Sequence, residues 1–177
     1  MFDLLARLRT RLGLVFGAAA FWFAQPTLGS IALGAAIAAV GEALRIWAAG
    51  HLHKSREVTA SGPYRWFSHP LYVGSSVLGV GLAVASASAV AAVLIAVYLS
   101  TTIAAAIRTE EAHLRGRFGD AYRQYKAGRA PAAARRFTFE RAIANGEHRT
   151  VAGIAAAVLL LALKATYNGL FWRVTGR

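Results

Sequence analysis

The chain has 177 residues, of which 56% are hydrophobic and 16% are charged, and its net charge is +12. Soluble domains average about a quarter charged residues, so this composition argues against a soluble enzyme and against a disordered chain. The absence of cysteine excludes disulfides, cysteine-ligated zinc and thiol nucleophiles. The positive charge suits either nucleic acid or a membrane surface, and the placement of the charges decides between them.

The apolar residues gather in five blocks, and a bilayer core requires about 20 such residues per helix. The blocks cover residues 12–24, 28–49, 70–85, 89–107 and 151–172. Short uncharged connections predict tight hairpins for the first two blocks and for the middle two, and a polar, basic stretch fills 108–149. We predict an all-α, polytopic membrane helix bundle of about five transmembrane helices, with a cytoplasmic amphipathic helical segment between the fourth and fifth.

Three regions follow from this division of the chain. Residues 1–50 form a transmembrane hairpin, 51–137 form a catalytic core, and 138–177 form an extension that carries the fifth helix. We expect the extension to cap the bundle, to mediate homo-oligomer formation or to contact a partner.

The basic residues alternate along the chain in a way that predicts orientation. They precede the first block and fill the second and fourth connections, whereas connections 25–30 and 86–88 carry no charge. By the positive-inside rule the N-terminus lies inside and the C-terminus outside a cytoplasmic (inner) membrane. Most of the positive charge therefore serves orientation and contact with the lipid bilayer, and we expect no nucleic-acid partner.

Polar residues concentrate first in 62–74, which reads Gly-Pro-Tyr-Arg-Trp-Phe-Ser-His-Pro-Leu-Tyr-Val-Gly and leads into the third span. Pro70 suits a first helical turn, where a missing N–H costs nothing. His69 is then expected at the helix N-terminus, at the membrane surface. Tyr72 and Gly74 fall on the first turns, where they can line a cavity that opens to the cytoplasm.

The second polar segment, 108–126, continues from the fourth span. Spacings of three and four residues predict one helical face, provided that the helix survives Gly116 and Gly119. An amphipathic surface helix accounts for this stripe, but not for two adjacent carboxylates at the end of a membrane span, which are costly unless paired or functional. The stripe consists of Glu111, Leu114, Phe118, Tyr122 and Tyr125, and the second carboxylate is Glu110.

Glu42 and Arg45 form a third polar group, three residues apart on the second span, where they can pair on one face. Two interpretations are equally compatible with this spacing: the pair stabilises the bundle, or it forms the polar wall of a cavity. His51 and His53 have no other evident ligand nearby, so we predict no metal site.

The two polar segments resemble the isoprenylcysteine carboxyl methyltransferase family of integral membrane methyltransferases. That family has the pattern Gly-x-Tyr-x-x-x-Arg-His-Pro-x-Tyr-x-Gly, then a helix hairpin, then Glu-Glu-x-x-Leu-x-x-x-Phe-Gly-x-x-Tyr-x-x-Tyr. The first motif is met by Gly62, Tyr64, His69, Pro70, Tyr72 and Gly74. The second is met by Glu110, Glu111, Leu114, Phe118, Gly119, Tyr122 and Tyr125.

The resemblance implies S-adenosylmethionine as methyl donor and a lipophilic acceptor that enters from the bilayer. It implies that the cofactor is bound by His69, Pro70, Tyr72, Gly74, Glu110, Glu111, Leu114, Tyr122 and Tyr125. We assign the acceptor to Glu42, Arg45 and Tyr64. A carboxylate and aromatic faces suit a sulfonium cation. For an amine or alcohol acceptor, His69 or Tyr72 is the candidate general base.

Two departures from the pattern bear on the acceptor. Ser68 stands where the family has an Arg before His-Pro, and the usual Val-Pro ending is Arg129-Ala130-Pro131. We expect Arg65 or Arg108 to supply the missing cation at the catalytic site, together with His69. Two alternatives remain: an NADPH-dependent enzyme like the membrane sterol reductases, and a non-catalytic membrane protein of the same fold.

Overall fold

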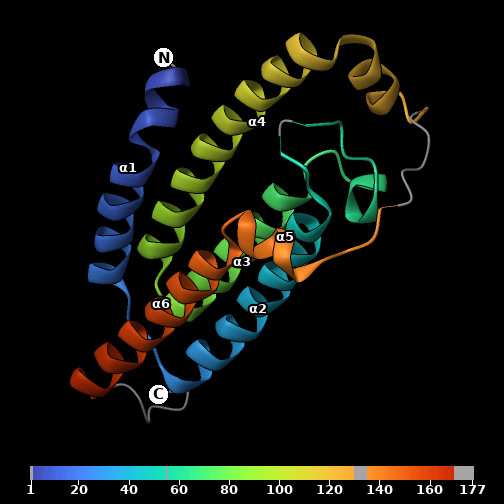
Figure 1. Ribbon diagram of the computed structural model, residues 1–177. Helices are drawn as coiled ribbons and strands as arrows, with labels where there is room; N and C mark the ends of the chain where they lie inside the picture. The colour runs from blue at the N-terminus through green and yellow to red at the C-terminus, as the bar shows by residue number, and fades with distance from the viewer. Residues whose placement is uncertain (1, 55, 130–134, 170–177) are drawn as a thin grey trace.

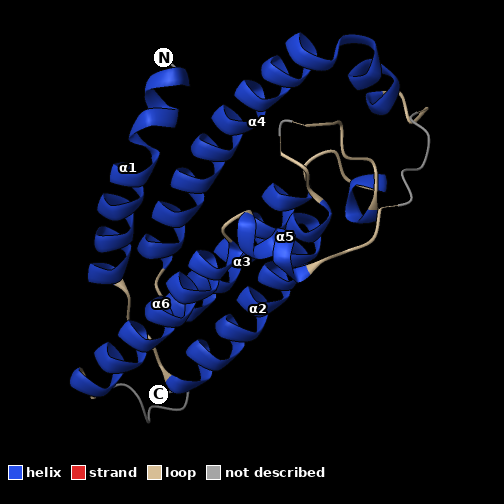
Figure 2. Ribbon diagram, in the orientation of Figure 1, coloured by secondary structure: helices blue, strands red, loops and turns tan. Residues whose placement is uncertain are grey.

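The computed structural model describes residues 2–54, 56–129 and 135–169, and this part of the chain is helical with no strand (Figure 2). Its elements, in chain order, are α1 (Phe2–Phe23), α2 (Leu28–His51), the 3-10 helix η1 (Gly62–Arg65), α3 (Pro70–Ser86), α4 (Ala89–Lys126), α5 (Phe139–Ala144) and α6 (Glu147–Tyr167). The predicted polytopic helical bundle is confirmed.

Three helices are long and apolar enough to cross a membrane, namely α2, α4 and α6. The other two predicted spans are shorter apolar segments, Arg11–Phe23 within α1 and Pro70–Ser86, which is α3. At about 1.5 Å per residue the 17 residues of α3 extend about 25 Å, somewhat less than the hydrocarbon core. The last predicted residues of the fifth span, 170–172, lie outside the described residues.

The apolar end of the bundle contains the two tight turns. Thr27 begins α2 with a reciprocal cap, in which its hydroxyl accepts from the Ser30 amide and the Ser30 hydroxyl accepts from the Thr27 amide. The Gln25 amide donates to the Ser86 carbonyl at 2.8 Å and so joins the two turns. Lys164 of α6 donates to the carbonyl of Trp22 at the end of α1, so α6 ends at this same side of the bundle (Figure 1).

Small residues let α2 and α3 pack backbone against backbone. A Cβ added to Gly41 would lie 2.5 Å from the Leu78 amide nitrogen, and one added to Gly34 would lie 2.4 Å from the Gly81 carbonyl oxygen. Small residues at Gly34, Ala38 and Gly41 thus permit the close approach of the two backbones. Gly17, by contrast, has nothing within 4 Å of its missing side chain.

At the opposite end of the bundle, α4 continues past its apolar part, 89–107, as the polar extension 108–126. This extension keeps helical backbone through Gly116 and kinks at Gly119, where φ is 45° and ψ is −112°. A glycine adopts such a positive φ without the steric cost of a Cβ. The kink turns the last residues of α4 back toward the loop before α3 (Figure 1), and so brings together the two polar segments that the sequence singled out.

Candidate functional site

A cavity of about 380 Å³ lies where the loop before α3, the first turns of α3 and the extension of α4 meet. Six predicted site residues line it: Tyr64, Tyr72, Glu110, Leu114, Tyr122 and Tyr125. Ser68, the departure from the family pattern, also lines it, as do Asn145 and Glu147 from the C-terminal extension. The two motifs therefore converge on one cavity although some forty residues separate them in sequence.

The tyrosines of this cavity form a connected wall. The Tyr125 hydroxyl donates to the Tyr64 carbonyl oxygen at 2.9 Å, and the rings of Tyr122 and Tyr125 lie 6.2 Å apart. Burial raises the pKa of Tyr122 and of Tyr125 to about 12, and it raises the pKa of Tyr64 beyond its ordinary range. All three hydroxyls are therefore neutral at physiological pH, and the Tyr125 hydroxyl already uses its proton in the bond to Tyr64.

The Tyr122 hydroxyl is an orphaned polar group. Tyr122 is 2% exposed, and within the described part of the chain its buried hydroxyl has no hydrogen-bond partner. A buried hydroxyl without a partner costs about 1–3 kcal/mol. Its position in the cavity wall means that a polar ligand could supply the missing partner.

Glu111 and His69 lie beside the cavity and hold its walls together. Glu111 accepts from Lys126 at 2.7 Å and from Arg115 at 2.8 Å, and one of its oxygens lies 3.3 Å from His69 Nε2. The hydrogen bond from Lys126 is the main reason that the pKa of Glu111 falls to about 2. The adjacent Glu110 lies 3.8 Å from His69 Nδ1. Sequence spacing did not predict the contact of Lys126 with Glu111, because that contact depends on the kink at Gly119, which turns the end of α4 back.

Arg45 organises a second polar cluster, on the side of α2 that faces α6. Its Nε lies 3.3 Å from Glu42, which confirms that these two residues can pair. The guanidinium also donates to both carboxylate oxygens of Glu147, at 3.0 and 3.1 Å, and to the Ser75 hydroxyl at 2.5 Å. The sequence did not predict Glu147 as a site residue, because it lies 102 residues from its partner Arg45 and no local pattern indicates the pair.

The remaining predicted site residues do not line this cavity. Arg65 is exposed and lines a neighbouring cavity of about 360 Å³, and Arg108 is exposed on α4. Pro70 begins α3 as expected and is buried. Gly74 faces α2, where an added Cβ would lie 2.6 Å from Arg45 Cγ. The ending at Ala130-Pro131 lies outside the described residues.

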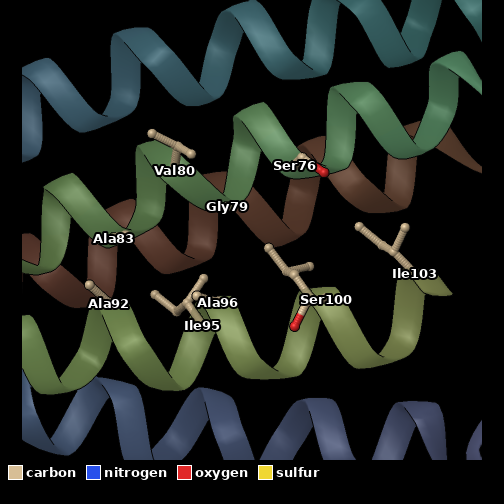
Figure 3. Close-up of a pocket in the computed structure, with 10 residues that line it drawn as sticks. Ser76, Gly79, Val80, Ala83, Ala92, Ile95, Ala96, Ser100 and Ile103 are labelled. Atoms are coloured by element: carbon tan, nitrogen blue, oxygen red, sulfur yellow. The ribbon is translucent and has the colours of Figure 1, made fainter. Parts of the chain in front are cut away.

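An apolar groove of about 270 Å³ runs between α3 and α4 (Figure 3). It is lined on one side by Ser76, Gly79, Val80 and Ala83, and on the other mainly by alanine, isoleucine and leucine side chains of α4. Ser76 is one turn beyond Tyr72 of the polar cavity, and Ile103 is three residues before Ala106, which also lines that cavity. The groove therefore leads along the helix pair toward the polar cavity.

The described residues include no group of three or more histidine, aspartate or glutamate side chains arranged to hold a metal ion. His51 is instead packed inside the fold, with its Nδ1 3.1 Å from the Ser61 hydroxyl.

Comparison with known proteins places the motifs in a family. The phospholipid methyltransferase family matches residues 14–121, which is more than half of the chain. The chain belongs to this family. It is 29% identical over 99 residues to the protein-S-isoprenylcysteine O-methyltransferase of Schizosaccharomyces pombe, which covers 56% of this chain and 42% of that protein. The methyltransferase resemblance that the two motifs predicted is thus confirmed.

A second relative carries a different description. The chain is 35% identical over 113 residues to the nickel-cobalt-cadmium resistance protein NccN of Alcaligenes xylosoxydans xylosoxydans, across 63% of this chain and 51% of that protein. The chain therefore spans about half the length of the curated relatives that it matches. No solved structure matches it.

Proposed function

We propose that this protein is an integral membrane methyltransferase that uses S-adenosylmethionine to methylate a lipophilic acceptor with a small carboxylate, amine or hydroxyl head. The observation that carries the proposal is the convergence of both motifs on one cavity, whose wall contains the orphaned Tyr122 hydroxyl. Family membership supports the reaction type, and the apolar helices fit a protein integral to a membrane.

The cavity residues suit the donor chemically. At about 380 Å³ the cavity falls within the usual size range of small-molecule sites. When bound, S-adenosylmethionine supplies a methyl group on a positively charged sulfur. The aromatic faces of Tyr64, Tyr72 and Tyr122, with the carboxylate of Glu110, are the groups that stabilise such a cation.

The groove between α3 and α4 suits the acceptor. Its wall offers the hydrocarbon part of a lipophilic molecule the same apolar surroundings as the bilayer (Figure 3). Because the groove leads toward the polar cavity, a chain lying in it would present its head group to the donor. Methyl transfer by displacement depends on in-line positioning and on exclusion of water, and the buried Tyr122 and Tyr64 serve both needs.

The same proposal sets the location and orientation. The cavity opens at the end of the bundle that holds the basic loops, and the positive-inside rule places that end in the cytoplasm. The membrane is then the inner membrane, with the N-terminus inside and the C-terminus outside. A donor from the cytoplasm and an acceptor from the bilayer would meet at this boundary.

Titration calorimetry of the detergent-purified full chain with S-adenosylmethionine tests the proposal. Tyr122→Phe removes an unpaired hydroxyl, so the ligand-free protein should melt at the same or a higher temperature while donor affinity falls. Glu110→Gln should weaken donor binding by roughly tenfold. The exposed Tyr167 and Glu140 provide matched controls, as Tyr167→Phe and Glu140→Gln.

Transfer is tested by incubating the protein with labelled donor and native lipids, followed by mass spectrometry of the methylated products. Donor binding with transfer to a lipid supports the proposal. Absence of donor binding by folded protein would overturn it, and NADPH binding in its place would favour a reductase. Donor binding without transfer to any lipid would reduce the protein to a non-catalytic member of the fold.

A further inference from the structure

The cavity includes a wall that comes from outside the matched family region. Asn145 and Glu147 both line it, whereas the family match ends at residue 121. They lie at the junction of α5 and α6, in the extension whose role the sequence left open.

This junction is anchored to the end of α2 by specific contacts. The side-chain amide of Asn145 donates to the carbonyls of Ala49 and Leu52, at 2.9 and 3.1 Å. The backbone amide of Thr138 donates to the Gly50 carbonyl at 3.2 Å. The bonds to Gly50 and Leu52 give partners to carbonyls at the C-terminus of α2, and the bond to Ala49 adds to the one that this carbonyl already accepts from the Leu52 amide. The position of the extension is therefore set by hydrogen bonds as well as by apolar packing.

Within this anchored segment, Glu147 is held in one orientation. Both of its carboxylate oxygens accept from the Arg45 guanidinium, at 3.0 and 3.1 Å, in the bidentate geometry that fixes a carboxylate most firmly. Arg45 also faces Glu42 at 3.3 Å, and both glutamate side chains are only 7% exposed. One guanidinium faces two buried carboxylates, so this cluster brings no net positive charge to the cavity.

The other charged residues that line the cavity do not make it positive either. Its lining includes Glu110 and Glu57, and the latter is paired with Arg135. Among the described lining residues Lys54, which is exposed, is the one lysine, and none of them is an arginine. A carboxylate head group would therefore meet carboxylates beside the tyrosine hydroxyls of the wall, with one exposed lysine to offset them, whereas an amine or hydroxyl would find several acceptors.

We propose that Glu147, positioned by Arg45, is a specificity-determining residue of the cavity and selects acceptors whose head group donates hydrogen bonds, an amine or a hydroxyl, over carboxylates. The inference rests on the proposed function and narrows its acceptor class. It assigns the extension a role in completing the site, so the chain needs α5 and the start of α6 in order to choose its acceptor.

A matched series of ligands with one hydrocarbon chain tests the inference, with binding of oleylamine, oleyl alcohol and oleate to the full chain measured in a neutral detergent. The net charge of +12 favours oleate wherever binding is non-specific, so preference for oleylamine requires a local site. We expect wild type to prefer oleylamine and oleyl alcohol to oleate. Glu147→Gln should reduce the preference for oleylamine by roughly tenfold to a hundredfold.

Two variants separate selection from folding. Glu147→Asp keeps the charge and should retain the preference, and Glu140→Gln, an exposed change on α5, should leave it unaltered. If Glu147 were only structural, Glu147→Gln would weaken all three ligands equally and leave their ratio intact, which would overturn the inference. Oleate binding to wild type as tightly as oleylamine would overturn it without any variant.

Failure of the inference about Glu147 can be told apart from failure of the proposed methyltransferase function. The ligand series needs no methyl donor, so head-group preference is measured even if S-adenosylmethionine does not bind. Donor binding and lipid methylation with no head-group preference would retain the function and remove the role of Glu147. Head-group preference without donor binding would retain the selective cavity and remove the methyltransferase.

Discussion

The contact between α2 and α3 gives the sharpest test of the fold, through Gly81→Ala. The added Cβ would lie 2.5 Å from the Ala38 amide nitrogen and 2.6 Å from the Gly34 carbonyl oxygen. Favourable contacts between heavy atoms lie at about 3.5–4.0 Å, so the two helices must separate by about 1 Å. Both neighbouring atoms belong to the backbone, and no side-chain rotation can relieve the overlap.

Overpacking of this kind costs about 1–3 kcal/mol. For a chain of this length each kcal/mol lowers the melting temperature by about 2–4 °C, so Gly81→Ala should melt about 2–12 °C below wild type. The assay is thermal unfolding of purified protein in one detergent, followed by circular dichroism at 222 nm. Far-ultraviolet signal at 20 °C checks that the variant has folded.

Gly17→Ala and Gly153→Ala are matched controls, because neither glycine has any atom within 4 Å of an added Cβ. Both changes should leave the melting temperature within a few degrees of wild type, since alanine favours the helix and meets nothing. If Gly81→Ala melts together with these controls, the backbone contact between α2 and α3 does not exist as described.

Two further expectations concern the polar end of the bundle. Tyr125→Phe removes the hydroxyl that donates to the Tyr64 carbonyl, so it should cost about 1 kcal/mol and speed amide hydrogen exchange in residues 62–67. Glu111 should link stability to pH. Its folded pKa of about 2 lies below its ordinary value of 4.5, chiefly because of the hydrogen bond from Lys126. Its stabilising contribution is therefore complete above about pH 4.5 and is lost as pH falls toward 2, and chemical unfolding of wild type and Glu111→Gln between pH 6 and 2.5 measures it.

The outcomes that contradict these expectations are distinct. Unchanged exchange in 62–67 after Tyr125→Phe would mean that the hydroxyl does not hold the loop, and Tyr167→Phe, at an exposed site, provides the baseline. For Glu111, the stability difference between wild type and Glu111→Gln should shrink as pH falls. A difference that stays constant from pH 6 to 2.5 would show that the carboxylate is not held by Lys126 in the folded protein.

The local pattern of the chain was sufficient for the helices. Apolar blocks separated by a Gln-Pro-Thr and a Ser-Ala-Ser turn satisfy their backbone polar groups in lipid by forming helices, and they became α1 to α4 and α6. The spacing of Glu111, Leu114 and Phe118 likewise predicted which side of the α4 extension is not exposed before the kink, because side chains three and four apart share a helix face. Tyr122 and Tyr125 lie beyond the kink at Gly119, so helical spacing does not account for their position.

The site depended on contacts that no local pattern records. The kink at Gly119 brings Lys126 back to Glu111, and the docking of α5 on α2 delivers Glu147 to Arg45 across 102 residues. Periodicity reports which way a side chain faces along its own helix, but not which distant helix lies opposite. The amino-acid sequence alone therefore determined the apolar helices, their order and the family motifs. The tertiary structure decided that Arg65 and Arg108 do not line the cavity on which the two motifs converge, whereas Glu147 forms part of its wall, because the packing of distant helices and not sequence spacing sets those positions.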